Sequence, residues 1–260
     1  MGLKPDDRVI RSDGIHNFRD YGGYGTQDGR RIAWRRLYRS SQHLEASDDD
    51  LKRLNVMNID QVIDLRGCKE RERFPCRRHP DFSAQILYAK GETVNSTHDD
   101  LSSAMGKEDV WRLMRDSYTN LPFLPRLQVA FQFFFKALAT AQQASLVHCL
   151  AGKDRTGLAV ALFHELMGVH RDDIMKDFLL TNEVGDVEKR IEAGARTIRS
   201  FYGEYVPDDI IRTLMGVDAG WLDAAFASIE AEYGDVRSYA AEILDINEER
   251  RNRLADIYLL

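Results

Sequence analysis

The sequence predicts an α/β fold, because short apolar runs of strand length alternate with longer segments of helical period. The clearest example is a strand over 145–147, which a tight loop connects to a buried helix over 156–167. A second, β-branched run over 59–65 predicts another buried strand. Strand, loop and helix in this order indicate a sheet whose strands are joined through helices.

Turn, cap and periodicity signals predict the remaining elements. Ser47 followed by three aspartates is typical of an N-cap with an acidic first turn. In chain order, we expect a hairpin over 20–29 leading into a strand at 37–39, a helix over 47–54, a strand at 86–89, and helices over 127–138, 221–233 and 239–244. The last two are expected to pack back on the sheet.

Length and composition predict a single domain over 1–260. The chain has 260 residues, 43% hydrophobic and 30% charged, which is typical of a folded globular protein and excludes disorder, collagen and a disulfide scaffold. The charged, weakly amphipathic stretch 182–220 predicts an inserted helical lid over one face. A net charge of -6 argues against nucleic acid as a partner, although a local basic pocket stays open.

Four features that the sequence lacks bear on location and cofactor use. The first residues lack the apolar core of a signal peptide, and no run approaches a membrane span, so we expect a cytoplasmic protein without stable membrane insertion. Cys68, Cys76 and Cys149 form no Cys-x-x-Cys pair, which favours reduced thiols. No cluster of metal ligands is visible, so no metal or cofactor is expected.

The chemistry is concentrated between Cys149 and Arg155, in the loop that joins a strand to a buried helix. A loop of this length at a helix N-terminus can wrap its N–H groups round a tetrahedral anion. Arg155 supplies a planar fork for phosphate oxygens, and these surroundings favour a thiolate at Cys149. The expected phosphate-binding residues are Leu150, Ala151, Gly152, Lys153, Arg155 and Thr156.

A thiolate in a phosphate cradle implies in-line attack on phosphorus and a phosphocysteine intermediate that water hydrolyses. Asp154 is the nearest acid and is expected to protonate the leaving group. Thr156 can donate a hydrogen bond to the sulfur. His148, at the strand end, is expected to order the loop through hydrogen bonds to backbone.

The loop has three alternative interpretations. A nucleotide-binding loop fails, because Lys153 is not followed by Ser or Thr and Val147 stands where a glycine is needed. A rhodanese-like sulfurtransferase also holds a cysteine in an anion cradle, but with a shorter loop and no acid beside the final arginine. A phosphate-binding pseudophosphatase module would usually lose the cysteine or the acid, and both are present.

The sequence resembles the bacterial tyrosine/serine (protein tyrosine/phosphoinositide) phosphatases of the cysteine-dependent phosphatase superfamily, whose loop reads His-Cys-x-x-Gly-Lys-Asp-Arg-Thr-Gly. The matching segments are 148–157, Asn17-Phe18-Arg19-Asp20-Tyr21-Gly22-Gly23, Tyr38-Arg39-Ser40, Val62-Ile63-Asp64-Leu65-Arg66 with Glu70, and Asp177-Phe178-Leu179-Leu180-Thr181-Asn182. The resemblance implies the cysteine-dependent phosphatase fold, a parallel-dominated sheet of four or five strands flanked by helices. It also implies Cys149 as nucleophile, Arg155 as phosphate ligand and Asp154 as acid.

The resemblance further implies dual specificity, with activity on phosphoinositides beside phosphoproteins. Lys153 can reach a second phosphate on an inositol ring, or it can act on Asp154 or Cys149. Asp64 and Arg66 end a central strand and should face the same crevice. They form either a supporting ion pair or a group in which Asp64 assists proton transfer or orients Arg155.

Two further expectations concern residues around the loop. Arg39 and the pair Arg19-Asp20 are expected to form ion pairs that hold it. Cys68 lies four positions after Asp64, so its thiol is either a partner that traps oxidised Cys149 as a disulfide or a small loop residue. The sequence specifies neither the physiological substrate nor the oligomeric state.

Overall fold

A five-stranded sheet lies at the centre of the computed structural model, which describes residues 8–93, 106–202 and 206–260. Its strands are β1 (Arg19–Asp20), β2 (Leu37–Ser40), β3 (Ile59–Asp64), β4 (Gln85–Tyr88) and β5 (Ala144–His148), in the order β1-β2-β5-β3-β4. β1 pairs with β2 antiparallel, and all other pairs are parallel. The predicted parallel-dominated sheet is therefore confirmed.

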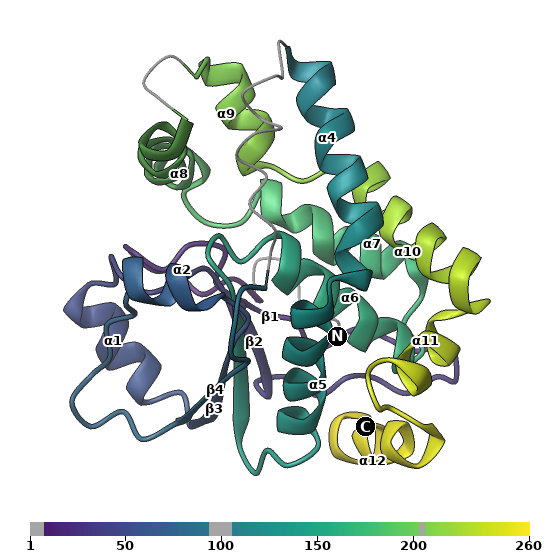
Figure 1. Cartoon of the computed structure of the whole chain (residues 1–260). Coiled ribbons are helices and arrows are strands. Elements are labelled where there is room, and N and C mark those ends of the chain that lie inside the picture. Colours follow the sequence, from purple (N-terminus) through teal and green to yellow (C-terminus); the bar gives the residue numbers. More distant parts are fainter. Residues whose placement is uncertain (1–7, 94–105, 203–205) are drawn as a thin grey trace.

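Helices cover both faces of the sheet, as predicted (Figure 1). On one face, α1 (Asp48–Asn55) buries Leu51 and Leu54 against Val62 and Leu146. The other face is covered by α5 (Pro125–Leu138) and α6 (Asp154–Leu166), whose phenylalanines and leucines form the larger core cluster. The sheet is thus buried between two helical layers, which is the usual arrangement of parallel strands.

The predicted start of α1 is confirmed in its local chemistry. The Ser47 hydroxyl accepts the Asp50 N–H at 3.1 Å, and the Asp50 carboxylate accepts the Ser47 N–H at 3.0 Å. This reciprocal capping box satisfies two N–H groups that the first turn would otherwise leave unpaired.

The remaining helices lie around the sheet and its two helical layers. They are α2 (Cys68–Arg73), α4 (Lys107–Asn120), α7 (Arg171–Leu179), α8 (Val187–Tyr202), α9 (Asp208–Met215), α10 (Ala219–Tyr233), α11 (Val236–Glu242) and α12 (Glu248–Tyr258), with short 3-10 turns at Leu121–Phe123 and Leu180–Asn182. Within the described ranges, none of the helices is long and apolar enough to cross a membrane.

The expectation that the two C-terminal helices pack on the sheet is wrong, since α11 lies against α10 and α6, and α10 lies against α4. In α10, the Trp221 indole N–H donates to the Trp111 carbonyl of α4 at 3.1 Å, and its ring lies 5.9 Å from that of Tyr118. The physical reason is that α5 and α6 already cover the sheet face, so the apolar side of α10 is buried by α4 instead.

The stretch 182–220 leaves and rejoins the domain at one point. The Asn182 amide donates to the Val217 carbonyl at 2.8 Å and accepts the Val217 N–H at 2.9 Å. Helices α8 and α9 lie between these two residues and stand over the carboxyl ends of the strands (Figure 1). The side chain of Asn182 therefore connects the two ends of the predicted insertion through two hydrogen bonds.

Candidate active site

The loop between β5 and α6 lies at the carboxyl end of the sheet, with Cys149 buried at its start. The helix begins at Asp154, two residues earlier than predicted, so Asp154 and Arg155 belong to its first turn. Gly152 has φ +68°, and a Cβ there would lie 2.3 Å from the Ser40 carbonyl oxygen. Only glycine fits this backbone conformation so close to β2.

The outer side of the loop is held by a buried polar network. The Gly152 carbonyl accepts Asn17 Nδ2 at 2.7 Å and Arg39 Nη2 at 3.0 Å. Arg39 Nη1 in turn donates to Asp177 Oδ2 at 2.9 Å, and Arg19 Nε lies 3.4 Å from Asp177 Oδ1. The arginines are therefore in ion pairs behind the loop, in agreement with the expectation for Arg39 and Arg19.

The Arg155 guanidinium is oriented by a carboxylate. Its Nη2 donates to Glu70 Oε1 at 2.7 Å, its Nη1 donates to Glu70 Oε2, and Nη1 also donates to the Thr93 hydroxyl at 3.0 Å. Although burial opposes the charge, Glu70 raises the pKa of Arg155, and Arg155 lowers the pKa of Glu70. Sequence reasoning noted Glu70 only as part of a matching segment and did not assign it to the site.

The Asp154 carboxyl group contacts two polar side chains. Tyr118 Oη donates to Asp154 Oδ1 at 2.8 Å, and Lys153 Nζ lies 3.3 Å from the same oxygen. Burial, with Asp154 adding to it, raises the pKa of Tyr118 well above its ordinary value, so the phenol stays a donor. Tyr118 comes from α4, a helix that the sequence analysis did not identify.

Lys153 connects the loop to the insertion. Its ammonium donates to the carbonyls of Leu214 and Gly216, at the C-terminal end of α9, with a distance of 3.1 Å to Gly216. The Trp221 ring lies 5.8 Å away. Carbonyls at a helix C-terminus carry partial negative charge, which suits an ammonium group.

Asp64 and Arg66 form a buried ion pair beneath the loop, with Arg66 Nε and Nη2 at 2.8 and 2.7 Å from the carboxylate. Burial opposes ionisation, but the charges of His148 and Arg66 lower the pKa of Asp64 to about 2. Arg155 bonds to Glu70, Thr93 and the Leu65 carbonyl, and Asp64 bonds to Arg66 instead. Of the two alternatives, this geometry agrees with the supporting ion pair.

His148 lies within this cluster. Its Nδ1 is 3.2 Å from the Cys149 carbonyl oxygen, and its Nε2 is 3.9 Å from Asp64 Oδ2. The His43 ring stacks on it at 5.0 Å. Burial lowers the pKa of His148 to about 4, so the ring is neutral at neutral pH.

The remaining loop residues and Cys68 have the following contacts. The Leu150 carbonyl accepts the Gln42 N–H at 3.0 Å, and Ala151 lies in the bend that leads to Gly152. The Thr156 hydroxyl is buried without a hydrogen-bond partner among the described residues.

Cys68 carries a free thiol whose Sγ accepts the Gly91 N–H at 3.2 Å. The disulfide hypothesis for Cys68 stays a prediction.

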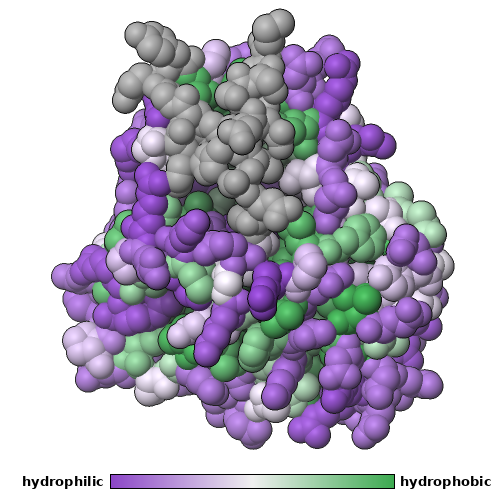
Figure 2. Space-filling view, viewed as in Figure 1, coloured by the Kyte–Doolittle hydropathy of each residue, from purple (hydrophilic) through white to green (hydrophobic). Residues whose placement is uncertain are grey.

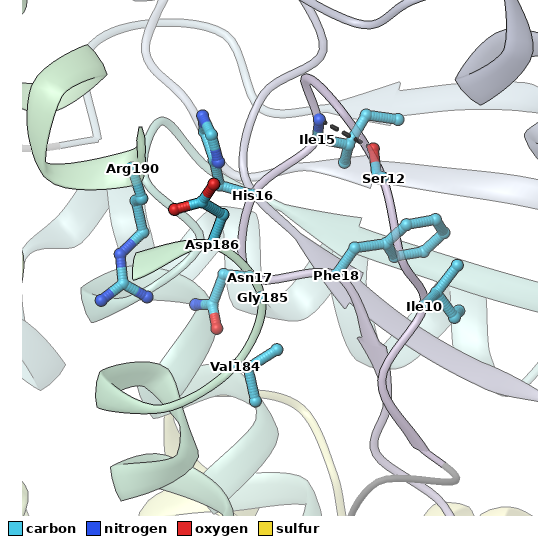
Figure 3. Close-up of a pocket in the computed structure, with 10 residues that line it drawn as sticks. All are labelled: Ile10, Ser12, Ile15, His16, Asn17, Phe18, Val184, Gly185, Asp186 and Arg190. Atoms are coloured by element: carbon cyan, nitrogen blue, oxygen red, sulfur yellow. Dashed lines mark hydrogen bonds between the residues drawn. The ribbon is translucent and has the colours of Figure 1, made fainter. Parts of the chain in front are cut away.

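A small hollow lies behind the loop, between the N-terminal segment and the start of α8 (Figure 3). Arg190 and Asn17 both line it, and Arg190 is almost fully buried with its Nε unpartnered in the described part of the chain. The volume of the hollow, about 10 Å³, admits about one water molecule. This hollow is therefore too small to be the phosphate site.

The described residues contain no group of three or more His, Cys, Asp and Glu side chains that could hold a metal ion.

Comparison with known proteins decides the family. The sequence profile of the tyrosine phosphatase family matches residues 10–260. The chain belongs to this family. It is 31% identical to a protein of Cupriavidus necator named as a tyrosine-protein phosphatase, over 90% of this chain and 84% of the relative. It is 29% identical to the triple specificity protein phosphatase PtpB of Mycobacterium tuberculosis, over 95% of this chain and 97% of the relative.

A tyrosine-protein phosphatase of Nostoc commune is 27% identical over 76% of this chain and 65% of that protein. The resemblance predicted from the loop and the flanking segments is thereby confirmed, and with it the cysteine-dependent phosphatase fold. The protein is a phosphatase, a hydrolase of phosphoric monoesters, and a sulfurtransferase is not favoured.

Proposed function

We propose that the protein hydrolyses phosphotyrosine through a covalent intermediate on Cys149. The supporting observation is that Cys149 begins a loop that leads into α6, where the guanidinium of Arg155 in the first turn is already oriented by Glu70. A preorganised guanidinium and the N-terminus of α6 are suited to the charge of a transferring phosphoryl group.

The reaction has two steps. In the first, the Cys149 thiolate attacks phosphorus, the bond from phosphorus to the ester oxygen breaks, and Asp154 gives its proton to the leaving oxygen. In the second, water attacks the phosphocysteine, the Asp154 carboxylate takes a proton from that water, and inorganic phosphate and the thiolate are released. The Thr156 hydroxyl is the candidate donor to the departing sulfur.

The nucleophile is tested by Cys149→Ser, because an alcohol is not ionised near neutral pH. This variant should bind phosphate esters but show less than about a hundredth of the wild-type rate, well within the loss expected for removing a nucleophile. Turnover of p-nitrophenyl phosphate above that level would refute the assignment.

The acid is tested by Asp154→Asn with two substrates of different leaving group. Phosphoserine, with a poor leaving group, should slow by about 10²- to 10⁴-fold, whereas p-nitrophenyl phosphate needs little protonation and should slow much less. Equal losses on both substrates would move the role to another group.

The substrate range is proposed to include phosphoserine, phosphothreonine and phosphoinositides, because one relative is named a triple specificity phosphatase. Lys153 is already bound to α9 carbonyls, so a second substrate phosphate would have to draw it away from them. Rates on phosphopeptides and phosphoinositides, measured side by side with wild type and Lys153→Met, test this range. Loss confined to phosphoinositides would assign Lys153 to the second phosphate.

We further propose that the insertion 182–220 acts as a lid over the Cys149 loop within a single phosphatase domain. The contacts of Lys153 with α9 and the place of α8 and α9 above the strand ends support this role (Figure 1).

A cytoplasmic location and the absence of nucleic-acid partners stay predictions. The free thiols of all three cysteines agree with a reducing compartment.

A further inference from the structure

One edge of the sheet is open and apolar. The opposite edge strand, β1, is buried, but every residue of β4 is accessible to solvent. In the described part of the chain, β4 pairs with β3 and with no strand on its outer side. Proteins usually protect such an edge, since its unpaired N–H and C=O groups can pair with another chain.

Exposed apolar side chains gather at this edge. Among the described residues, the exposed large apolar side chains are Val56, Ile86, Tyr88, Phe133 and Leu260, and three of these five lie on β4 and the neighbouring α5. They line a groove of about 500 Å³ together with Leu87, Val129, Lys90 and Arg126. Figure 2 shows apolar surface between hydrophilic side chains over this region.

The groove offers apolar contacts on both faces of the strand. Successive side chains of a strand point to opposite faces. Leu87 packs on the core side, where Val129 also lies. Ile86 and Tyr88 project to the other face, where the Arg71 guanidinium lies 4.2 Å from the Tyr88 ring. A strand added to this edge would therefore meet apolar surface on both of its faces.

Charge is concentrated at one end of the groove. Lys90 lies two residues after the end of β4, and Arg126 lies in the first turn of α5. Both are exposed, and neither has a carboxylate partner in the described ranges of the chain. This end of the groove therefore favours an acidic residue in the bound segment.

The end of the groove that carries Lys90 and Arg126 lies at the same edge of the sheet as the Cys149 loop. Tyr88 is level with Asp64, and Asp64 is level with His148, the residue before Cys149. An added strand would lie three strand spacings from β5, which is about 14 Å. About four extended residues span that distance.

We propose that β4 and α5 form a docking groove for an extended segment of a phosphoprotein substrate, which adds to the sheet as a further strand. The segment carries apolar side chains, places an acidic residue against Lys90 and Arg126, and presents a phosphotyrosine about four residues away to Cys149. This inference rests on the proposed phosphotyrosine activity and adds to it a class of substrate.

The test compares two synthetic phosphotyrosine peptides. The long peptide carries a Val-Thr-Val-Thr-Val segment joined to phosphotyrosine through about four residues, two of them glutamate. The short peptide lacks the apolar segment. In the wild-type protein, the long peptide should have a KM at least about tenfold lower, as expected for a well-packed apolar contact.

Ile86→Lys places a charge on the edge and should abolish this difference in KM, while the rate on p-nitrophenyl phosphate stays unchanged. Phe133→Lys, on α5, is a second variant that decides the matter if Ile86→Lys does not fold. Lys90→Glu combined with Arg126→Glu should raise the KM of the long peptide alone. The matched control is Val56→Lys, which changes an apolar residue of 73% exposure at the end of α1 and should behave as wild type.

Equal KM values for the two peptides in the wild type would overturn the docking proposal, as would a difference that persists in both folded edge variants. Hydrolysis of p-nitrophenyl phosphate distinguishes failure of the docking groove from failure of the proposed phosphatase activity. Normal hydrolysis with no difference between peptides refutes only the groove, whereas no hydrolysis by the wild type refutes the proposed function and the groove with it.

Discussion

Replacing Asp177 by asparagine tests whether a buried carboxylate holds the Cys149 loop in place. Asp177 is 1% exposed and contacts the guanidinium groups of Arg39 and Arg19, which are fully buried. Burial alone would raise the pKa of this carboxyl, but Arg19 and Arg39 hold it well below its ordinary value. Asp177 is therefore ionised at neutral pH. Asparagine removes this negative charge and keeps the shape of the side chain.

The expected loss follows from the two cations that remain. Removing one partner of a buried ion pair costs about 3–5 kcal/mol, because the other charge stays buried without compensation. For a chain of this size, each kcal/mol lowers Tm by about 2–4 °C, so Asp177→Asn should lower it by about 6–20 °C. The stabilisation is present above the unfolded pKa near 3.8 and is lost as the pH falls below it.

The measurement is thermal unfolding at pH 7, together with kcat on p-nitrophenyl phosphate well below Tm. The rate should fall as well, since Arg39 also donates to the Gly152 carbonyl. Asp173→Asn is the matched control on the same helix, because its partner Lys176 is exposed and such pairs contribute under about 1 kcal/mol. A Tm equal to that of the control would refute the reasoning.

Three further predictions concern the site. Glu70→Gln should lower kcat/KM on p-nitrophenyl phosphate by about ten- to hundredfold through misorientation of Arg155, and an unchanged value would show that the guanidinium is positioned without it. Tyr118→Phe should slow phenyl phosphate more than p-nitrophenyl phosphate if the phenol positions Asp154, and equal effects would contradict this. Burial lowers the pKa of His148 from 6.5 to about 4, so stability is complete above pH 6.5 and is lost as the pH falls towards 4, by up to about 3 kcal/mol. Urea unfolding that is flat between pH 7 and 4.5 would exclude this.

The sequence alone predicted the strands and the loop well, because each has a local signal. The β-branched run at β3 and the cap at Ser47 depend only on neighbouring residues. The partners of the loop could not be found in this way. Tyr118 and Asp177 reach it from helices remote in sequence, and α4 carries its apolar residues for α9 and α10 rather than for the sheet. Their roles depend on tertiary packing, which periodicity does not encode.

The position of the Lys153 ammonium has a thermodynamic consequence. The same group that lies 3.3 Å from Asp154 is held by carbonyls at the end of α9. A ligand that attracts this ammonium must break its contacts with α9, and a change in α9 that strengthens those contacts must weaken the ligand. Because such linkage is reciprocal, affinity at the loop and the conformation of the insertion are governed by one coupling free energy, shared through a single side chain.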